Sequence, residues 1–213
     1  MSLASSLRRM LAIAGLVTLG GCGAISVVSS ASEDLAAFTL APLDTGQRQA
    51  AVGGHLIVEE PTASGALATD RILIKPNRIQ AQYLPGARWV EPAPLLIQTL
   101  LVQSIENSGR FRLVGRRAMG LQPDFTLMTE LRDFQAEASH PAEGPGLTVR
   151  VGLVLTLIRE SDRSIVGSRR VESVVAAPTS DALPLVSAFD AALSAALAEL
   201  VAWTANSARA GPS

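Results

Sequence analysis

The segment RILIKPNRIQAQYLPGARWVEPAPLLIQTLLVQSIENSGRFRLV, residues 71–114, joins two kinds of apolar periodicity. Its first half alternates apolar and polar side chains between residues 72 and 83, which is the period of a half-buried β-strand. Pro76-Asn77 and Pro85-Gly86 interrupt this half with typical turn residues. The first half therefore predicts two extended stretches separated by a turn, and a second turn that leads into Trp89.

The second half of the segment predicts a helix from Pro92 to Ser108. Proline suits the first turn of a helix because its missing N–H would have no partner there. Gly109 can adopt the left-handed conformation that ends a helix. Gln98 and Gln103 are expected to lie mostly away from the apolar face. That face is formed by Leu96, Ile97, Leu100, Leu101 and Ile105. The residues after the helix alternate again and predict a further strand.

Outside this segment, alternation predicts more strands. They are expected at residues 38–40, 55–58, 125–131, 147–158 and 165–175. A break in the alternation at Asp133-Phe134 predicts a bulge, and the polar sequence from Glu160 to Arg163 predicts a hairpin turn. We therefore expect the last three strands to be long, successive and antiparallel.

A second helix is expected after Thr179-Ser180-Asp181, whose side chains suit an N-cap. Its apolar stripe consists of Val186, Phe189, Leu193, Leu197, Leu200 and Trp203. Such a stripe is typical of a helix that packs on a sheet or on another helix, rather than of a membrane role. The complete pattern predicts an α+β domain over residues 36–208, with a mixed, largely antiparallel sheet and two main helices packed on it.

The N-terminal residues have the layout of a secretory signal peptide. Arg8 and Arg9 precede an apolar run, and the run ends in Leu19-Gly20-Gly21-Cys22. This order is similar to that of lipoprotein precursors, whose cysteine thiol is diacylated before the chain is cut in front of it. We predict a signal peptide over residues 1–21, lipidation of Cys22 by fatty acids such as palmitate, and a flexible tether over residues 22–35. A plain membrane anchor is the alternative, but four glycines make a weak spanning helix.

Charge and cysteine content limit the classes of partner. Removing Arg8 and Arg9 from the 18 basic residues leaves 16 against 19 acidic ones, a net charge of −3 for the mature chain. This balance favours no nucleic-acid partner. Cys22 is the only cysteine, so an internal disulfide is excluded. Gly23 follows it, and by the sorting rule known from enterobacteria this residue indicates the outer membrane.

The sequence carries no motif of enzyme chemistry. His55 and His140 are far apart, and no nucleophile-elbow pattern or metal-ligand pair accompanies them. A glycine-rich phosphate-binding loop is also missing from the sequence, so ATP hydrolysis would require a partner protein. We expect no catalytic residue, no metal and no cofactor.

The run from Tyr83 to Pro92, the leucine-rich helix and the sequence Ser108-Gly109-Arg110-Phe111 resemble the ABC-type transport auxiliary lipoproteins. These accompany Mce-domain lipid transporters, and the Pqi-type lipoprotein is one of them. The resemblance extends from about Phe38 to the final helix. It implies a periplasm-facing outer-membrane lipoprotein that acts as an auxiliary adaptor in intermembrane lipid transport. The implied partners are an Mce-domain protein and an ABC permease and ATPase. The alternative is an assembly or pilot lipoprotein of another envelope machine, and a lipid-handling hydrolase is disfavoured.

Two surface questions stay open at this point. Trp89 either fills the junction between the turn and the helix, with Arg88 in solvent, or forms a partner-binding hot spot with Arg88, since both residue types are enriched at such sites. The strand at residues 147–158 turns apolar on its second face at Val154 and Ile158. Such a face needs cover from a helix or from another protomer. The resemblance implies a ring-forming homo-oligomer, and a monomer whose helices cover both residues is the alternative.

Overall fold

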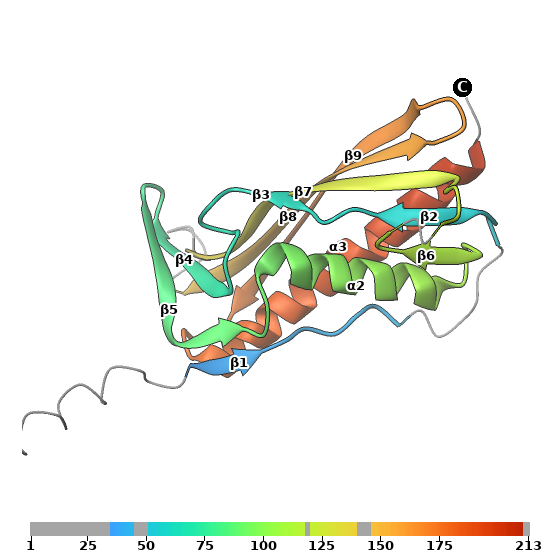
Figure 1. Cartoon of the computed structure of the whole chain (residues 1–213). Coiled ribbons are helices and arrows are strands. Elements are labelled where there is room, and N and C mark those ends of the chain that lie inside the picture. Colours follow the sequence, from blue (N-terminus) through green and yellow to red (C-terminus); the bar gives the residue numbers. More distant parts are fainter. Residues whose placement is uncertain (1–34, 45–50, 118–119, 140–145, 211–213) are drawn as a thin grey trace, which may run out of the picture. The chain divides into compact units, whose positions relative to one another are not determined.

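Strand β7 (Phe125–Ala138) lies at the centre of the sheet (Figure 1). The computed structural model describes residues 35–44, 51–117, 120–139 and 146–210, and within these ranges four strands pair with β7. Strand β8 (Leu147–Arg159) runs antiparallel along one edge of β7. Three shorter strands run parallel along the other edge: β2 (His55–Val58), β3 (Thr62–Ala63) and β4 (Arg71–Asn77).

The remaining strands extend the sheet on both sides. β9 (Ser164–Ala177) pairs antiparallel with β8. β5 (Gln80–Trp89) forms an antiparallel hairpin with β4, and β1 (Ala36–Phe38) runs parallel to β5. β6 (Leu113–Gly115) runs parallel to β2. The sheet is therefore mixed, and its long strands β7, β8 and β9 are successive antiparallel neighbours, as predicted. The predicted bulge is confirmed by a register shift between Leu131 and Asp133.

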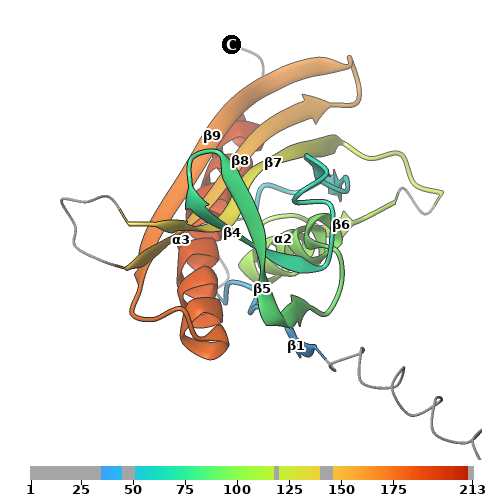
Figure 2. The ribbon, with the colours of Figure 1, turned by 90° about the vertical axis from the view of Figure 1, so that its left-hand side faces the viewer.

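Both helices lie beneath the same face of the curved sheet (Figure 2). α2 (Ala93–Ser108) follows Pro92 and ends at Gly109, which has a φ of 64°. α3 (Ala182–Ala210) packs against β8 and β9. The side chains of β8 that face the helices have no exposed surface, namely Val149, Val151, Leu153, Leu155 and Leu157. Burial of each such side chain stabilises the fold by about 1.5–3 kcal/mol, so the alternation of β8 supplies much of the core.

Helix α3 is, among the described residues, the one helix long and apolar enough to cross a membrane by length and composition. However, 56% of its apolar window is buried inside the protein, and Phe189 and Leu197 have no exposed surface. The predicted apolar stripe thus belongs to a core helix of the α+β domain.

The predicted turns of the β4–β5 hairpin need correction. The chain reverses at Arg78-Ile79 rather than at Pro76-Asn77. The Asn77 side chain closes this turn, because its Oδ1 accepts a hydrogen bond from the Ile79 N–H at 3.1 Å. The predicted turn is therefore two residues too early, and Asn77 contributes to the observed turn through its side chain.

Pro85-Gly86 does not form the predicted turn, because β5 continues through it as a bulge. Arg71 pairs with Arg88 and Leu73 pairs with Tyr83, so Ile72 of β4 lies opposite the four residues 84–87 of β5. Within this bulge Gly86 has a φ of 67°. The strand continues because its last three residues pair with β1. β1 lies about 50 positions earlier in the chain. Turn propensities describe neighbouring residues only, so they could not predict this pairing.

Gln98 was also expected away from the apolar face, and this expectation is wrong. The side chain is 5% exposed, and its Nε2 donates a hydrogen bond to the Val58 carbonyl at 3.0 Å. Gln103, which is predicted to lie away from the apolar face as well, is exposed, so that prediction is confirmed. Gln98 thus uses a buried position of α2 to hold strand β2.

Candidate partner-binding surfaces

Trp89 ends β5, and its indole lies in the core with 1% of its surface exposed. Its ring centroid is 5.3 Å from that of Phe134 on β7 and 5.2 Å from that of Phe189 on α3. The two phenylalanine rings are 5.0 Å apart, so the three rings form a closed cluster. Each aromatic pair adds about 0.5–1.5 kcal/mol to the gain from area burial. The burial of Trp89 agrees with the interpretation in which it fills the junction before α2.

Arg88 lies on the solvent side of the same junction. Its Nη1 is 3.5 Å from Asp70 Oδ2 and 3.2 Å from the Trp89 carbonyl oxygen, and the side chain is 37% exposed. An exposed ion pair of this kind contributes at most about 1 kcal/mol, so a partner can take over the guanidinium at small cost. Val90, next in the chain, is 48% exposed. A partner-binding role for Arg88 and Trp89 stays a prediction, in which Arg88 is the member at the surface.

The outer face of the sheet, opposite to the helices, carries an apolar patch. We define this apolar patch as Met128, Val154, Ile158 and Ile165, which line a shallow pocket of about 270 Å³. Met128 and Ile165 are 43% and 67% exposed. Because both described helices pack on the opposite face, the alternative in which helices cover Val154 and Ile158 is wrong. Three acidic side chains, Glu59, Glu60 and Glu130, line the same pocket.

The other half of the outer face is occupied by paired charges. Arg150 of β8 lies between Glu137 of β7, at 3.2 Å, and Glu172 of β9. Arg170 also reaches Glu172, at 3.1 Å. Burial lowers the pKa of Arg150, but its hydrogen bonds to Glu137 and Glu172 outweigh this effect and raise that pKa. These paired charges bound the apolar patch on the side away from the β8–β9 turn.

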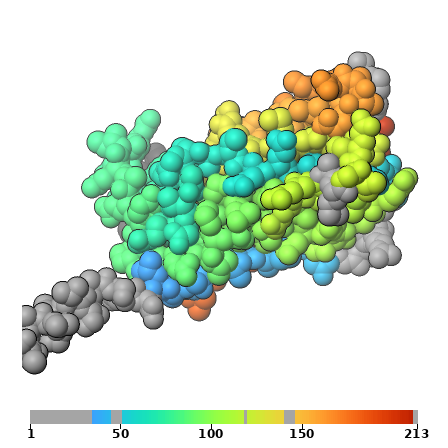
Figure 3. Space-filling model, in the orientation of Figure 1, coloured from blue at the N-terminus to red at the C-terminus, as the bar shows by residue number. Residues whose placement is uncertain are grey.

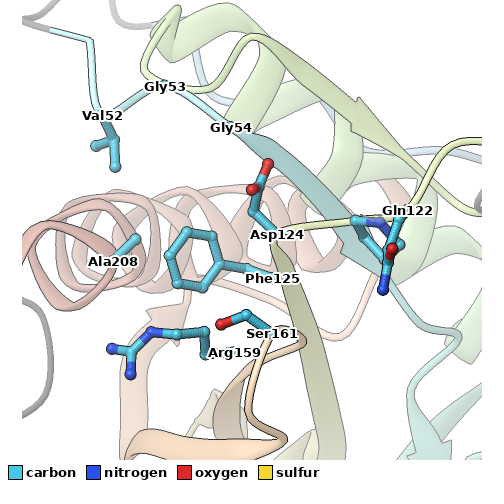
Figure 4. A pocket seen from close by; sticks show the side chains of 10 residues that line it. Val52, Gly53, Gly54, Gln122, Asp124, Phe125, Arg159, Ser161 and Ala208 are labelled. Atoms are coloured by element: carbon cyan, nitrogen blue, oxygen red, sulfur yellow. The ribbon is translucent and has the colours of Figure 1, made fainter.

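A larger pocket, of about 680 Å³, opens where β2 and β7 begin (Figure 4). Its charged groups are engaged in holding turns. Asp124 Oδ2 accepts a hydrogen bond from the His55 N–H at 2.7 Å, and Arg159 Nη1 lies 3.4 Å from Asp162 Oδ2. A side chain at Gly54 would place its Cβ 2.9 Å from Asp124 Oδ2. The sequence did not indicate this pocket, because its lining comes from several separate ends of strands and from α3.

The described part of the chain offers no metal centre, since no group of three or more His, Cys, Asp or Glu side chains is placed to hold an ion. His55 begins β2 and is half-buried. His140 and Cys22 lie outside the described residues, as do the predicted signal peptide and nearly all of the tether. Lipidation at Cys22 therefore stays a prediction.

Comparisons with known proteins cover most of the described part of the chain. The model of a family described as ABC-type transport auxiliary lipoprotein component matches residues 38–202. An uncharacterised protein of Bradyrhizobium diazoefficiens is 28% identical over 166 residues, which are 76% of this chain and 42% of that protein. The chain thus spans less than half the length of that curated relative.

Solved structures share the fold. A crystal structure from Xanthomonas campestris superposes with a TM-score of 0.71 at 25% identity, over 83% of this chain and 97% of that chain. The structure of a hypothetical protein from Chlamydia trachomatis superposes with a TM-score of 0.52 at 8% identity, over 75% and 99% of the two chains. The second likeness concerns the fold alone.

Proposed function

Because the chain belongs to the family of ABC-type transport auxiliary lipoprotein components, we propose that it is an outer-membrane lipoprotein that faces the periplasm and serves an Mce-type system of intermembrane lipid transport. The observation that carries this proposal is the family match over residues 38–202, which includes all of α2, α3 as far as residue 202, and every described strand after β1. The family is one of transport components, not of enzymes. An adaptor role needs a stable scaffold and a docking surface, and the buried aromatic cluster and the exposed apolar patch support this proposal.

Anchoring depends on Cys22 in this proposal. Three acyl chains on one terminus hold a protein stably at a membrane, because each buried methylene contributes about 0.8 kcal/mol. Gly23 follows the cysteine, which supports the outer membrane as the destination. The tether then lets the folded unit face the periplasm.

Docking depends on the two surfaces described above. We assign the apolar patch to contact between copies of this chain, because it lies on the helix-free face and exposes Met128 and Ile165. Arg88, beside the exposed Val90, is assigned to contact with the Mce-domain protein. Separate surfaces for the two contacts allow an oligomer to hold the end of a transport channel.

The test is purification of the full-length chain from its own membranes after mild cross-linking, with identification of the attached proteins. We expect the Mce-domain protein, the permease and the ATPase to be recovered together with this chain. An Arg88→Glu chain should recover less of the Mce-domain protein, whereas Arg117→Glu, a matched exposed arginine elsewhere, should not. Recovery of a secretin or a lipopolysaccharide-assembly protein instead would overturn the proposal in favour of a pilot lipoprotein.

A further inference from the structure

The β4–β5 hairpin projects from the end of the protein at which β1 lies (Figures 1 and 3). Residues 77–83 are all exposed, and Ile79 at the tip has 98% of its surface exposed. An isoleucine in this position contributes nothing to the core, and its apolar surface is accessible to a partner.

The base of the hairpin is firmly held, so the tip has a defined position. The Arg71 guanidinium lies 5.5 Å above the centre of the Tyr83 ring, and the Tyr83 hydroxyl donates to the Ala66 carbonyl at 3.4 Å. Leu73 and Leu84 are buried beneath it. At the tip, the Asn77 side chain closes the turn.

The hairpin is positively charged in a protein that is acidic as a whole. Between residues 72 and 87 the sequence contains Lys75 and Arg78 and no acidic residue, while the whole chain has a net charge of −1. Glu137 lines the same small pocket as Lys75 and Arg78, but its carboxylate is bonded to Arg150 and Gln135. The β8–β9 turn, by contrast, contains acids as well as arginines.

The chain enters the described domain through β1, which pairs with the base of the hairpin. Ala36 pairs with Ala87 in parallel, at the end of β5 away from the tip. Leu35 lies thirteen positions after Cys22 in the sequence, a stretch that spans at most about 45 Å. Ile79 lies eight positions before Ala87, a stretch that spans at most about 26 Å. A chain anchored at Cys22 therefore has enough length for the tip to reach the same membrane.

We propose that the tip of the β4–β5 hairpin inserts Ile79 into the anionic phospholipid surface of the membrane that holds Cys22, with Lys75 and Arg78 at the lipid headgroups. This inference rests on the proposed lipoprotein function. An apolar side chain flanked by cations is the combination that interfacial segments use. Tyr83, 38% exposed, supplies an aromatic ring of the kind enriched at the headgroup level.

Contact between the hairpin tip and the membrane would orient the folded domain relative to the membrane. β4 pairs with the last residues of β7, whereas the β8–β9 turn lies beside the first residues of β7. With the hairpin on the membrane, the end that carries Ile165 and the apolar patch points into the periplasm. Membrane contact and assembly thus use opposite ends of the sheet.

The test uses the full-length chain, matured in cells and reconstituted into vesicles, with an environment-sensitive fluorophore on the thiol of Ile79→Cys. Acylated Cys22 has no free thiol, so the introduced cysteine is the single labelling site. The matched control is Leu121→Cys, because Leu121 is 51% exposed and precedes the first residues of β7, at the end of the sheet opposite to the hairpin. In vesicles that contain phosphatidylglycerol, the label at 79 should emit at shorter wavelength and be quenched by brominated acyl chains, and the label at 121 should do neither.

Removal of the two cations supplies a second readout. Lys75→Gln with Arg78→Gln should lower the ratio of inserted to water-exposed tips by about 30-fold in the same vesicles, the factor expected for two cations near an anionic surface. A label at 79 that stays in water in phosphatidylglycerol vesicles would overturn the inference. So would a label that becomes protected only when the Mce-domain protein is added, because the tip would then bind a protein.

Failure of the anchor is a separate result. The mass of the N-terminal peptide from the same sample shows whether Cys22 is acylated. If Cys22 is acylated and the label at 79 stays in water, the inference about the tip fails and the lipoprotein function stands. If Cys22 is not acylated, the lipoprotein function fails, and the inference that rests on it fails with it.

Discussion

The indole of Trp89 meets the phenyl ring of Phe189 edge-on, with an interplanar angle of 80° and centroids 5.2 Å apart. The two residues are 100 positions apart in the chain and belong to β5 and α3. Phe134 of β7 completes the cluster. The strand that carries the hairpin tip is thereby fixed to the core of the sheet and to its longest helix.

Loss of the Trp89 ring should destabilise the entire domain. We expect Trp89→Ala to lower the free energy of unfolding by about 3–5 kcal/mol, the usual cost for a large buried aromatic residue. Arg88→Ala should lower it by at most about 1 kcal/mol, since its ion pair is exposed. Urea unfolding of both variants measures the difference. Equal small losses would mean that the indole is not part of the core, and would favour the hot-spot interpretation.

The buried amide of Gln98 should also contribute to stability. Gln98→Ala removes the donor to the Val58 carbonyl and leaves a buried acceptor unpaired, at a cost of about 1–3 kcal/mol. Gln103→Ala on the same helix is a matched control, because Gln103 is exposed and such changes stay within about 0.5 kcal/mol. If unfolding curves of the two variants coincide, the buried hydrogen bond contributes no stability.

The β8–β9 turn should show a pH dependence. Hydrogen bonds from the Ser164 side chain and backbone, together with Arg159, hold the pKa of Asp162 below its usual value of 3.8. A carboxyl group with a lower pKa in the folded state stabilises the fold above the unfolded-state pKa, and this contribution is lost as pH falls through the folded-state pKa. The stability difference between the protein and Asp162→Asn should therefore shrink below about pH 4. A difference that stays constant from pH 7 to pH 2 would exclude this linkage.

The apolar patch should control self-association. A chain that begins at Leu35, where the compact unit begins, is expected to melt cooperatively and to form an oligomer that light scattering detects. Ile165→Asp should dissociate it, because a charge would be buried without a partner. Leu183→Asp changes a side chain of equal exposure at the start of α3 and should leave the mass unchanged. A monomer at every concentration, or an oligomer unaffected by Ile165→Asp, would refute the assignment of the patch.

Local sequence signals predicted those features that depend on neighbours in the chain. Pro92 and Gly109 bracket α2 as expected, and the alternation from Leu147 onward predicted β8. The features that the sequence did not reveal depend on distant partners. The burial of Gln98 depends on a carbonyl 40 positions away, the bulge at Gly86 on pairing with β1, and the burial of Trp89 on two distant rings. The apolar patch is likewise exposed because both described helices pack on the opposite face of the sheet, which the sequence pattern alone does not determine.

Lipid attachment at Cys22 is the most direct measure of the lipoprotein role in the envelope. The measurement is the mass of the N-terminal peptide of the chain isolated from the outer-membrane fraction, with Cys22→Ser analysed alongside. We predict a peptide that begins at Cys22 and carries acyl chains, and a Cys22→Ser chain that stays uncut or moves to the soluble periplasmic fraction. A chain recovered from the outer membrane with Cys22 unmodified, or a Cys22→Ser chain that still fractionates there, would contradict it.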